Sequence, residues 1–210
     1  MIPGATLEII NQRLERSQRR KKWNLVIIIG GICNFTTRIK AKKTRKLEYK
    51  DRKTEATKQA IEDILEHQGD IAQICTLTPA NILKHNKVSV KGDSEEQKQL
   101  VSDIEELNQF IINKNIERDW PTIDLARQSY TASLKKQGNK KKRIQKFTDK
   151  ELADGVHPTT HLKATWASYM APVIVKILEK LSDKQKEESS SSESEDEELE
   201  SWNFKRQHMH

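Results

Sequence analysis

The stretch WNLVIIIGG, from Trp23 to Gly31, decides the fold class of this chain. Its centre is an unbroken apolar run rich in valine and isoleucine, and two glycines end it. A short continuous run of this kind is typical of a strand that is buried on both faces, as in a parallel sheet. We therefore predict a buried parallel strand that ends close to Gly30.

The segments downstream of this strand alternate between helical and extended patterns. Residues 53–69 have apolar positions at helical spacing, and residues 70–78 form a second apolar run that Pro79 stops. Residues 94–118 carry the clearest helical stripe, with Ser94 as a predicted N-cap. A short third strand is expected at Thr122–Leu125, and two further helices at 6–22 and 159–181.

This alternation predicts an α/β domain of three α/β/α layers with a mostly parallel, flavodoxin-like sheet. Ligands of such sheets bind beyond the carboxyl ends of the strands. We expect the loop after Ile29, the loop after Leu77 and the turn Asp154–His157 to meet there.

Composition divides the chain into a domain and a tail. The sequence has 210 residues, of which 34% are hydrophobic and 33% are charged. We predict an α/β domain over 1–182 and a disordered acidic tail over 183–210, because the tail is rich in serine and glutamate and has little to bury. No apolar run reaches the roughly 18 residues of a membrane span, and the N-terminal region does not resemble a signal peptide. An intracellular protein, cytoplasmic or nuclear, is expected, with no membrane partner and with Cys33 and Cys75 as buried free thiols.

Positive charge is concentrated in two segments, Arg38–Lys46 and Lys135–Lys146, and the whole chain has a net charge of +7. Solvated loops are one interpretation, and a nuclear import signal within Lys140–Arg143 is another. A third is that the two segments bind nucleic acid or another polyanion. Few aromatic residues lie in these segments, so base stacking on single strands is not indicated.

The sequence DGVHP, Asp154 to Pro158, joins an aspartate and a histidine three residues apart. One interpretation is a turn that begins a helix, because Asp-Gly favours turns and Pro158 suits a helix start. The other is a remnant of a catalytic pair. His161 follows His157 by four residues, but no third metal ligand is placed near them in the sequence, so neither a metal nor a cofactor is predicted.

Four stretches together resemble the SGNH (GDSL-type) hydrolase and esterase superfamily. They are PGAT at 3–6, VIIIGGICNFT at 26–36, CTLTPANILKHN at 75–86 and DGVHPTTH at 154–161. The resemblance spans roughly residues 3–178. It implies that His157 is a general base, that Asp154 orients its ring, and that Gly4 and Asn34 contribute to an oxyanion hole.

The chain departs from this family at two positions. No Gly-Asp-Ser segment with the serine nucleophile precedes Pro3, and Cys33 stands where the family has its oxyanion asparagine, so that Asn34 falls one place late. We therefore expect a degenerate or N-terminally incomplete member, non-catalytic as given, that acts as a binding or interaction module. The alternatives are a basic nucleic-acid-associated protein, and an active esterase if the nucleophile lies upstream. Without the family's first strand, an uncovered sheet edge beside Leu25–Ile29 predicts self-association.

Overall fold

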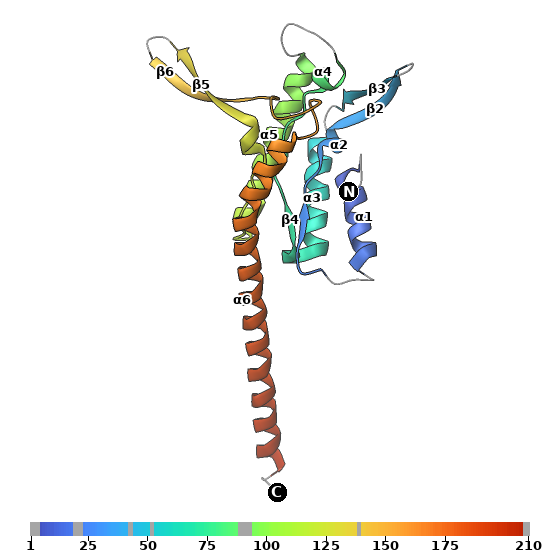
Figure 1. Cartoon of the computed structure of the whole chain (residues 1–210). Coiled ribbons are helices and arrows are strands. Elements are labelled where there is room, and N and C mark those ends of the chain that lie inside the picture. The colour runs from blue at the N-terminus through green and yellow to red at the C-terminus, as the bar shows by residue number, and fades with distance from the viewer. Residues whose placement is uncertain are drawn as a thin grey trace. The chain divides into compact units, whose positions relative to one another are not determined.

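The computed structural model describes residues 5–18, 23–41, 44–50, 53–87, 94–137 and 140–207 (Figure 1). The chain divides into two compact units, Met1–Val173 and Ile174–His210. The helices are α1 (Leu7–Gln18), α2 (Ile32–Phe35), α3 (Thr54–Gln68), α4 (Ile82–His85), α5 (Glu95–Glu117) and α6 (Thr160–Gln207), with short 3-10 helices η1 (Gly69–Ile71) and η2 (Ala126–Ser129). The strands are β1 (Val26–Ile28), β2 (Thr36–Ala41), β3 (Thr44–Tyr49), β4 (Ala72–Ile74), β5 (Tyr130–Gln137) and β6 (Lys140–Phe147).

The first unit is a mixed α/β domain with a small parallel sheet. Strands β1 and β4 pair in parallel, with Val26 opposite Ala72 and Ile28 opposite Ile74. The strands are where the apolar runs predict them, but each has only 3 residues. The third predicted strand, Thr122–Leu125, is not a strand in the structure, although the Thr76 N–H donates a hydrogen bond of 3.1 Å to the Ile123 carbonyl. A single ladder bond of this kind extends the sheet by one contact without forming a regular strand.

The core of this unit lies between the sheet and helices α1, α3 and α5. These helices have the predicted periodicity, which turns one apolar stripe of each toward the strands. Helix α5 begins where expected, because the Ser94 Oγ accepts a hydrogen bond of 3.2 Å from the Gln97 N–H. The largest fully buried side chains of the core are Leu7, Phe35, Ile61, Ile64, Leu100, Ile104, Leu107 and Ile111.

Three side-chain amides each bond to both a backbone N–H and a backbone carbonyl of another segment, and we call them the amide clamps. Each donates its N–H to a backbone carbonyl and accepts a backbone N–H with its oxygen, at distances between 2.6 and 2.9 Å. The clamps and the backbone that they bridge are Asn86 with Leu47, Asn108 with Leu77, and Gln97 with Ile82 and Ala80. Such a pair of bonds replaces the ladder partner that a strand would supply, and it satisfies groups that are costly to bury unpaired.

The two basic segments, for which solvated loops are one interpretation, form antiparallel hairpins in the structure. Strand β2 pairs with β3 from Thr36↔Tyr49 to Ala41↔Thr44, and β5 pairs with β6 from Tyr130↔Phe147 to Gln137↔Lys140. Within the first unit, Figure 1 draws both as ribbons that project from the helices. Backbone pairing satisfies the N–H and C=O groups of a chain that has few apolar side chains to bury, so the hairpins form without an apolar alternation.

Helix α6 begins in the first unit and continues through the second as far as Gln207. It therefore includes most of the 183–210 segment, for which composition predicts disorder. That segment has no proline or glycine and is rich in glutamate, which favours helices. Among the residues that the structure describes, no helix is long and apolar enough to cross a membrane.

Candidate functional site

The turn from Leu152 to Pro158 is built around the carboxylate of Asp154. Its Oδ1 accepts the N–H of Val156 at 3.0 Å and the N–H of His157 at 2.8 Å. The Ala153 N–H donates a hydrogen bond of 2.7 Å to the His157 carbonyl, and Leu152 and Pro158 form an isolated antiparallel bridge. A short acidic side chain that bonds its own following backbone is a common way to fix a turn. The turn interpretation of DGVHP is therefore compatible with a functional one, because the same carboxylate has a second oxygen.

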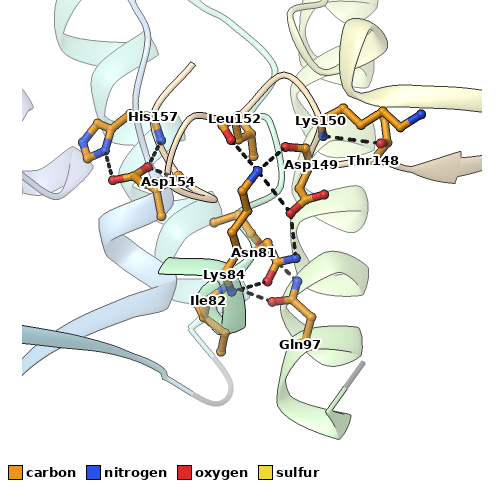
Figure 2. A network of polar contacts seen from close by, with 12 residues as sticks. Asn81, Ile82, Lys84, Gln97, Thr148, Asp149, Lys150, Leu152, Asp154 and His157 are labelled. Atoms are coloured by element: carbon orange, nitrogen blue, oxygen red, sulfur yellow. Dashed lines mark hydrogen bonds and ion pairs between the residues drawn. The ribbon is translucent and has the colours of Figure 1, made fainter. Parts of the chain in front are cut away.

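That second oxygen, Asp154 Oδ2, lies 2.8 Å from Nδ1 of His157 (Figure 2). The histidine side chain is 62% exposed, so its opposite ring edge is accessible to a ligand. His85 of α4 also approaches, with its Nδ1 3.4 Å from the same oxygen. Asp154 thus lies beside two imidazole rings and orients that of His157.

The charge of Asp154 is favoured by its surroundings. Partial burial acts to raise the pKa of Asp154, but the hydrogen bonds from the N–H and the ring of His157 and from the N–H of Val156 outweigh burial. The pKa consequently lies well below its usual range. At neutral pH the group is a carboxylate, which accepts hydrogen bonds and donates none. Nδ1 of His157 is therefore the donor in this contact, and a ring that carries one proton presents Nε2 as an acceptor.

Gly155 fixes the turn against the segment that follows β4. Its carbonyl accepts a 2.6 Å hydrogen bond from the Asn81 N–H. Its φ is +85°, and a Cβ at this position would lie only 2.3 Å from the Asn81 carbonyl oxygen. A side chain at position 155 would therefore be both strained and blocked, so glycine is required.

Lys84 and Asn81 hold the chain leading into the turn (Figure 2). The Lys84 ammonium donates to the carbonyls of Asp149 at 3.0 Å and Leu152 at 2.8 Å, and it lies 3.5 Å from the Asp149 carboxylate. The Asn81 Nδ2 donates a hydrogen bond of 3.1 Å to that carboxylate. The Asn81 Oδ1 caps α4 by accepting a hydrogen bond of 2.9 Å from the Lys84 N–H. Residues 149–155 are thus fixed to α4 by side chains that the sequence analysis did not single out. Asn81 was detectable as an asparagine directly before a helix, but nothing local marks Lys84 or His85.

The loop after β1 packs on the same segment. Gly31 has a φ of +122°, and a Cβ there would lie 2.7 Å from Cδ2 of Leu77. Leu77 and Asn81 both belong to the stretch that leaves the carboxyl end of β4, so the β1 loop and the Asp154 turn share one support. The β1 loop thus contacts this stretch at Leu77, and the Asp154 turn contacts it at Asn81.

Asn34 lies on that loop, but its amide is already used. Its Oδ1 accepts the N–H of Leu7 at 3.0 Å, and its Nδ2 lies 3.1 Å from each carboxylate oxygen of Glu8. The side chain therefore joins α2 to the first turn of α1, and the nearby carboxylate would repel an oxyanion. Gly4, the other expected oxyanion donor, lies outside the described residues.

The surroundings of both cysteines favour the protonated thiol over the nucleophilic thiolate. Burial raises the pKa of Cys33, although Arg38 and Lys50 act to lower it, and burial raises the pKa of Cys75 to about 12. Both are free, as expected, with Cys75 buried and Cys33 partly exposed. Over the part of the chain that the structure describes, no cluster of three histidine, cysteine or acidic residues is arranged to hold a metal, and His161 pairs instead with Glu151 at 3.2 Å.

Comparison with known proteins adds no relative. No family model, curated protein or solved structure matches the chain. The geometry of the Asp154 turn is therefore the main indication of function.

Proposed function

We propose that the first unit is an SGNH-hydrolase-like domain that retains the histidine–aspartate half of a hydrolytic site and acts as a binding module. The observation that carries this proposal is the 2.8 Å contact between Asp154 Oδ2 and His157 Nδ1, on a turn whose other carboxylate oxygen is held by two backbone N–H groups. In hydrolases a carboxylate orients the histidine in this way so that Nε2 accepts a proton. Here Nε2 would accept a hydrogen bond from the hydroxyl or amide N–H of a small acyl ligand.

The proposed kinship extends to the fold. In a three-layer, flavodoxin-like domain β1, β4 and the 122–125 segment would be successive members of one parallel sheet. The bond from the Thr76 N–H to the Ile123 carbonyl supports this order, as do the loops that meet beyond the carboxyl ends of β1 and β4.

A binding role is favoured over catalysis by what surrounds His157. Among the described residues, no serine, threonine or cysteine side chain donates a hydrogen bond to its ring. The expected oxyanion donor Asn34 is occupied by Glu8, and the raised pKa of Cys33 keeps its thiol protonated. Covalent ester cleavage requires a nucleophile and an oxyanion hole in addition to a general base. The surroundings of His157 therefore favour binding.

The test has a kinetic and a binding part. Hydrolysis of p-nitrophenyl acetate should be at background for the wild type and equal in His157→Ala and Asp154→Asn. Titration with the stable amide N-(4-nitrophenyl)acetamide, followed by NMR, should shift the His157 ring signals in the wild type and much less in Asp154→Asn.

Two results would contradict the proposal. A wild-type rate ten or more times that of His157→Ala would establish an esterase in place of a binding module. An unchanged His157 signal at millimolar amide would remove the acyl-binding role.

A further inference from the structure

The two hairpins carry a large excess of positive charge. Strands β2 and β3 of the first hairpin have four basic residues and one acidic residue. The β5–β6 hairpin, residues 130–147, has seven basic residues and no acidic residue. The acidic residues that pair with lysines on α3 and α5 have no counterpart in the second hairpin.

The strand register places like charges directly opposite one another. Lys135 is opposite Lys142 and Lys136 is opposite Lys141. In the other hairpin Lys40 is opposite Arg45. Directly opposed like charges destabilise a strand pair. A hairpin with such pairs gains stability from a ligand that supplies closely spaced negative charge.

The bases of both hairpins are firmly attached, and they are attached around the same short helix. The amide clamp of Asn86, next to the end of α4, holds Leu47 of β3. At the base of the β5–β6 hairpin, the Thr148 N–H donates a hydrogen bond of 2.7 Å to the Ser129 carbonyl. The following residue, Asp149, contacts Lys84 of α4. The bases of both hairpins are therefore held by residues in α4 or directly after it. The same helix supports the Asp154 turn.

We propose that the β2–β3 and β5–β6 hairpins bind the phosphate backbone of double-stranded DNA. A two-stranded ribbon fits the major groove of B-DNA, and eight residues per strand span about 26 Å, which exceeds the groove depth. A protein partner is disfavoured, because protein interfaces depend on buried aromatic anchors and residues 135–143 contain no aromatic residue. Single strands are disfavoured as well, since Tyr130 and Phe147 pack edge to face against each other at the hairpin base and are not free to stack on bases.

The test is fluorescence anisotropy of a labelled 24-base-pair duplex with the full chain between 50 and 200 mM NaCl. One variant replaces Lys140, Lys141, Lys142 and Arg143 with glutamine, and a second replaces Arg38, Lys40, Arg45 and Lys46. A control variant replaces four lysines of α6 with glutamine and so removes the same amount of positive charge outside the hairpins. These lysines are Lys163, Lys176, Lys180 and Lys184.

Binding by the wild type should weaken steeply with salt. Each hairpin variant should lose at least tenfold in affinity at 100 mM NaCl, and its logarithmic salt slope should fall by about 3 to 4 if all four cations contact phosphate. The control should change by less than threefold. The first variant removes two opposed like-charge pairs, so its thermal midpoint should equal or exceed that of the wild type; if it unfolds instead, the second variant decides.

Four outcomes would overturn the inference. These are wild-type binding that does not depend on salt, hairpin variants that bind as well as the wild type, and a control that loses as much affinity as the hairpin variants. The fourth is a polyglutamate peptide or a single strand of equal charge that competes as well as the duplex, which would assign the surface to acidic proteins or to single strands. These residues are separate from His157, so this result and the acyl-binding test stand or fall independently.

Discussion

Replacing Gly155 with alanine should separate backbone strain from steric contact at the Asp154 turn. A residue with a side chain at a φ of +85° costs about 1–2 kcal/mol. The new Cβ would also lie 2.3 Å from the Asn81 carbonyl oxygen and 3.1 Å from the His85 nitrogen, and both contacts are with backbone. The turn must therefore move away and lose the hydrogen bond between Asn81 and Gly155, which adds about 1–3 kcal/mol for partly buried groups left unpaired.

Gly69→Ala is the matched control. Gly69 has a φ of +60° and a ψ of −144°, a conformation that strains alanine, but a Cβ there meets no atom within 4 Å. We expect Gly155→Ala to destabilise the protein by about 2 kcal/mol more than Gly69→Ala, or about 4–8 °C in thermal midpoint for a chain of this size. Circular dichroism during heating and urea titration both measure the difference. Equal losses in the two variants would refute the close packing of the turn on α4.

Two further variants test the polar contacts. Asn108→Ala removes both hydrogen bonds to Leu77 and should lower the free energy of unfolding in urea by about 2–4 kcal/mol. The control Asn113→Ala, on the exposed side of α5, should change it by less than about 0.5 kcal/mol. Similar losses in the two variants would contradict the stabilising role of the Asn108 clamp. Asp154→Asn tests the depressed pKa, whose contribution to stability is present above the unfolded pKa of about 3.9 and is lost as pH falls below it. The difference in thermal midpoint between wild type and Asp154→Asn should be constant from pH 5 to 7 and should narrow progressively below pH 4, toward the lower pKa of the folded state. A gap at pH 2 as large as the gap at pH 6 would exclude this origin.

The helices were predictable because their apolar residues follow a regular period, and the first strand because its apolar run is short and continuous. Helix α3 runs from Thr54 to Gln68, as its spacing indicates, and Ser94 caps α5. Strand β1 is shorter than its apolar run, and Ile29 directly after it is 52% exposed. Periodicity detects burial but cannot show where hydrogen-bonded pairing stops.

The hairpins were missed because charge dominates their sequences. The register pairs Gln137 with Lys140, and the sequence between them, Gly138-Asn139, is a known hairpin signal. Apolar alternation, the usual mark of a half-buried strand, is absent from these segments. Asp154 and His157 were identified from their spacing, but His85 and Lys84 reach the turn from about 70 residues away, and no local pattern reports such a contact.

The amide clamps make this fold sensitive to chemical ageing. Slow hydrolysis of an asparagine or glutamine side chain exchanges its nitrogen for oxygen and leaves a carboxylate of nearly the same shape. At Asn86, Gln97 or Asn108 the product would place that carboxylate against the backbone carbonyl that the amide formerly held. Stored protein should therefore lose structure in step with the release of ammonia from these three positions.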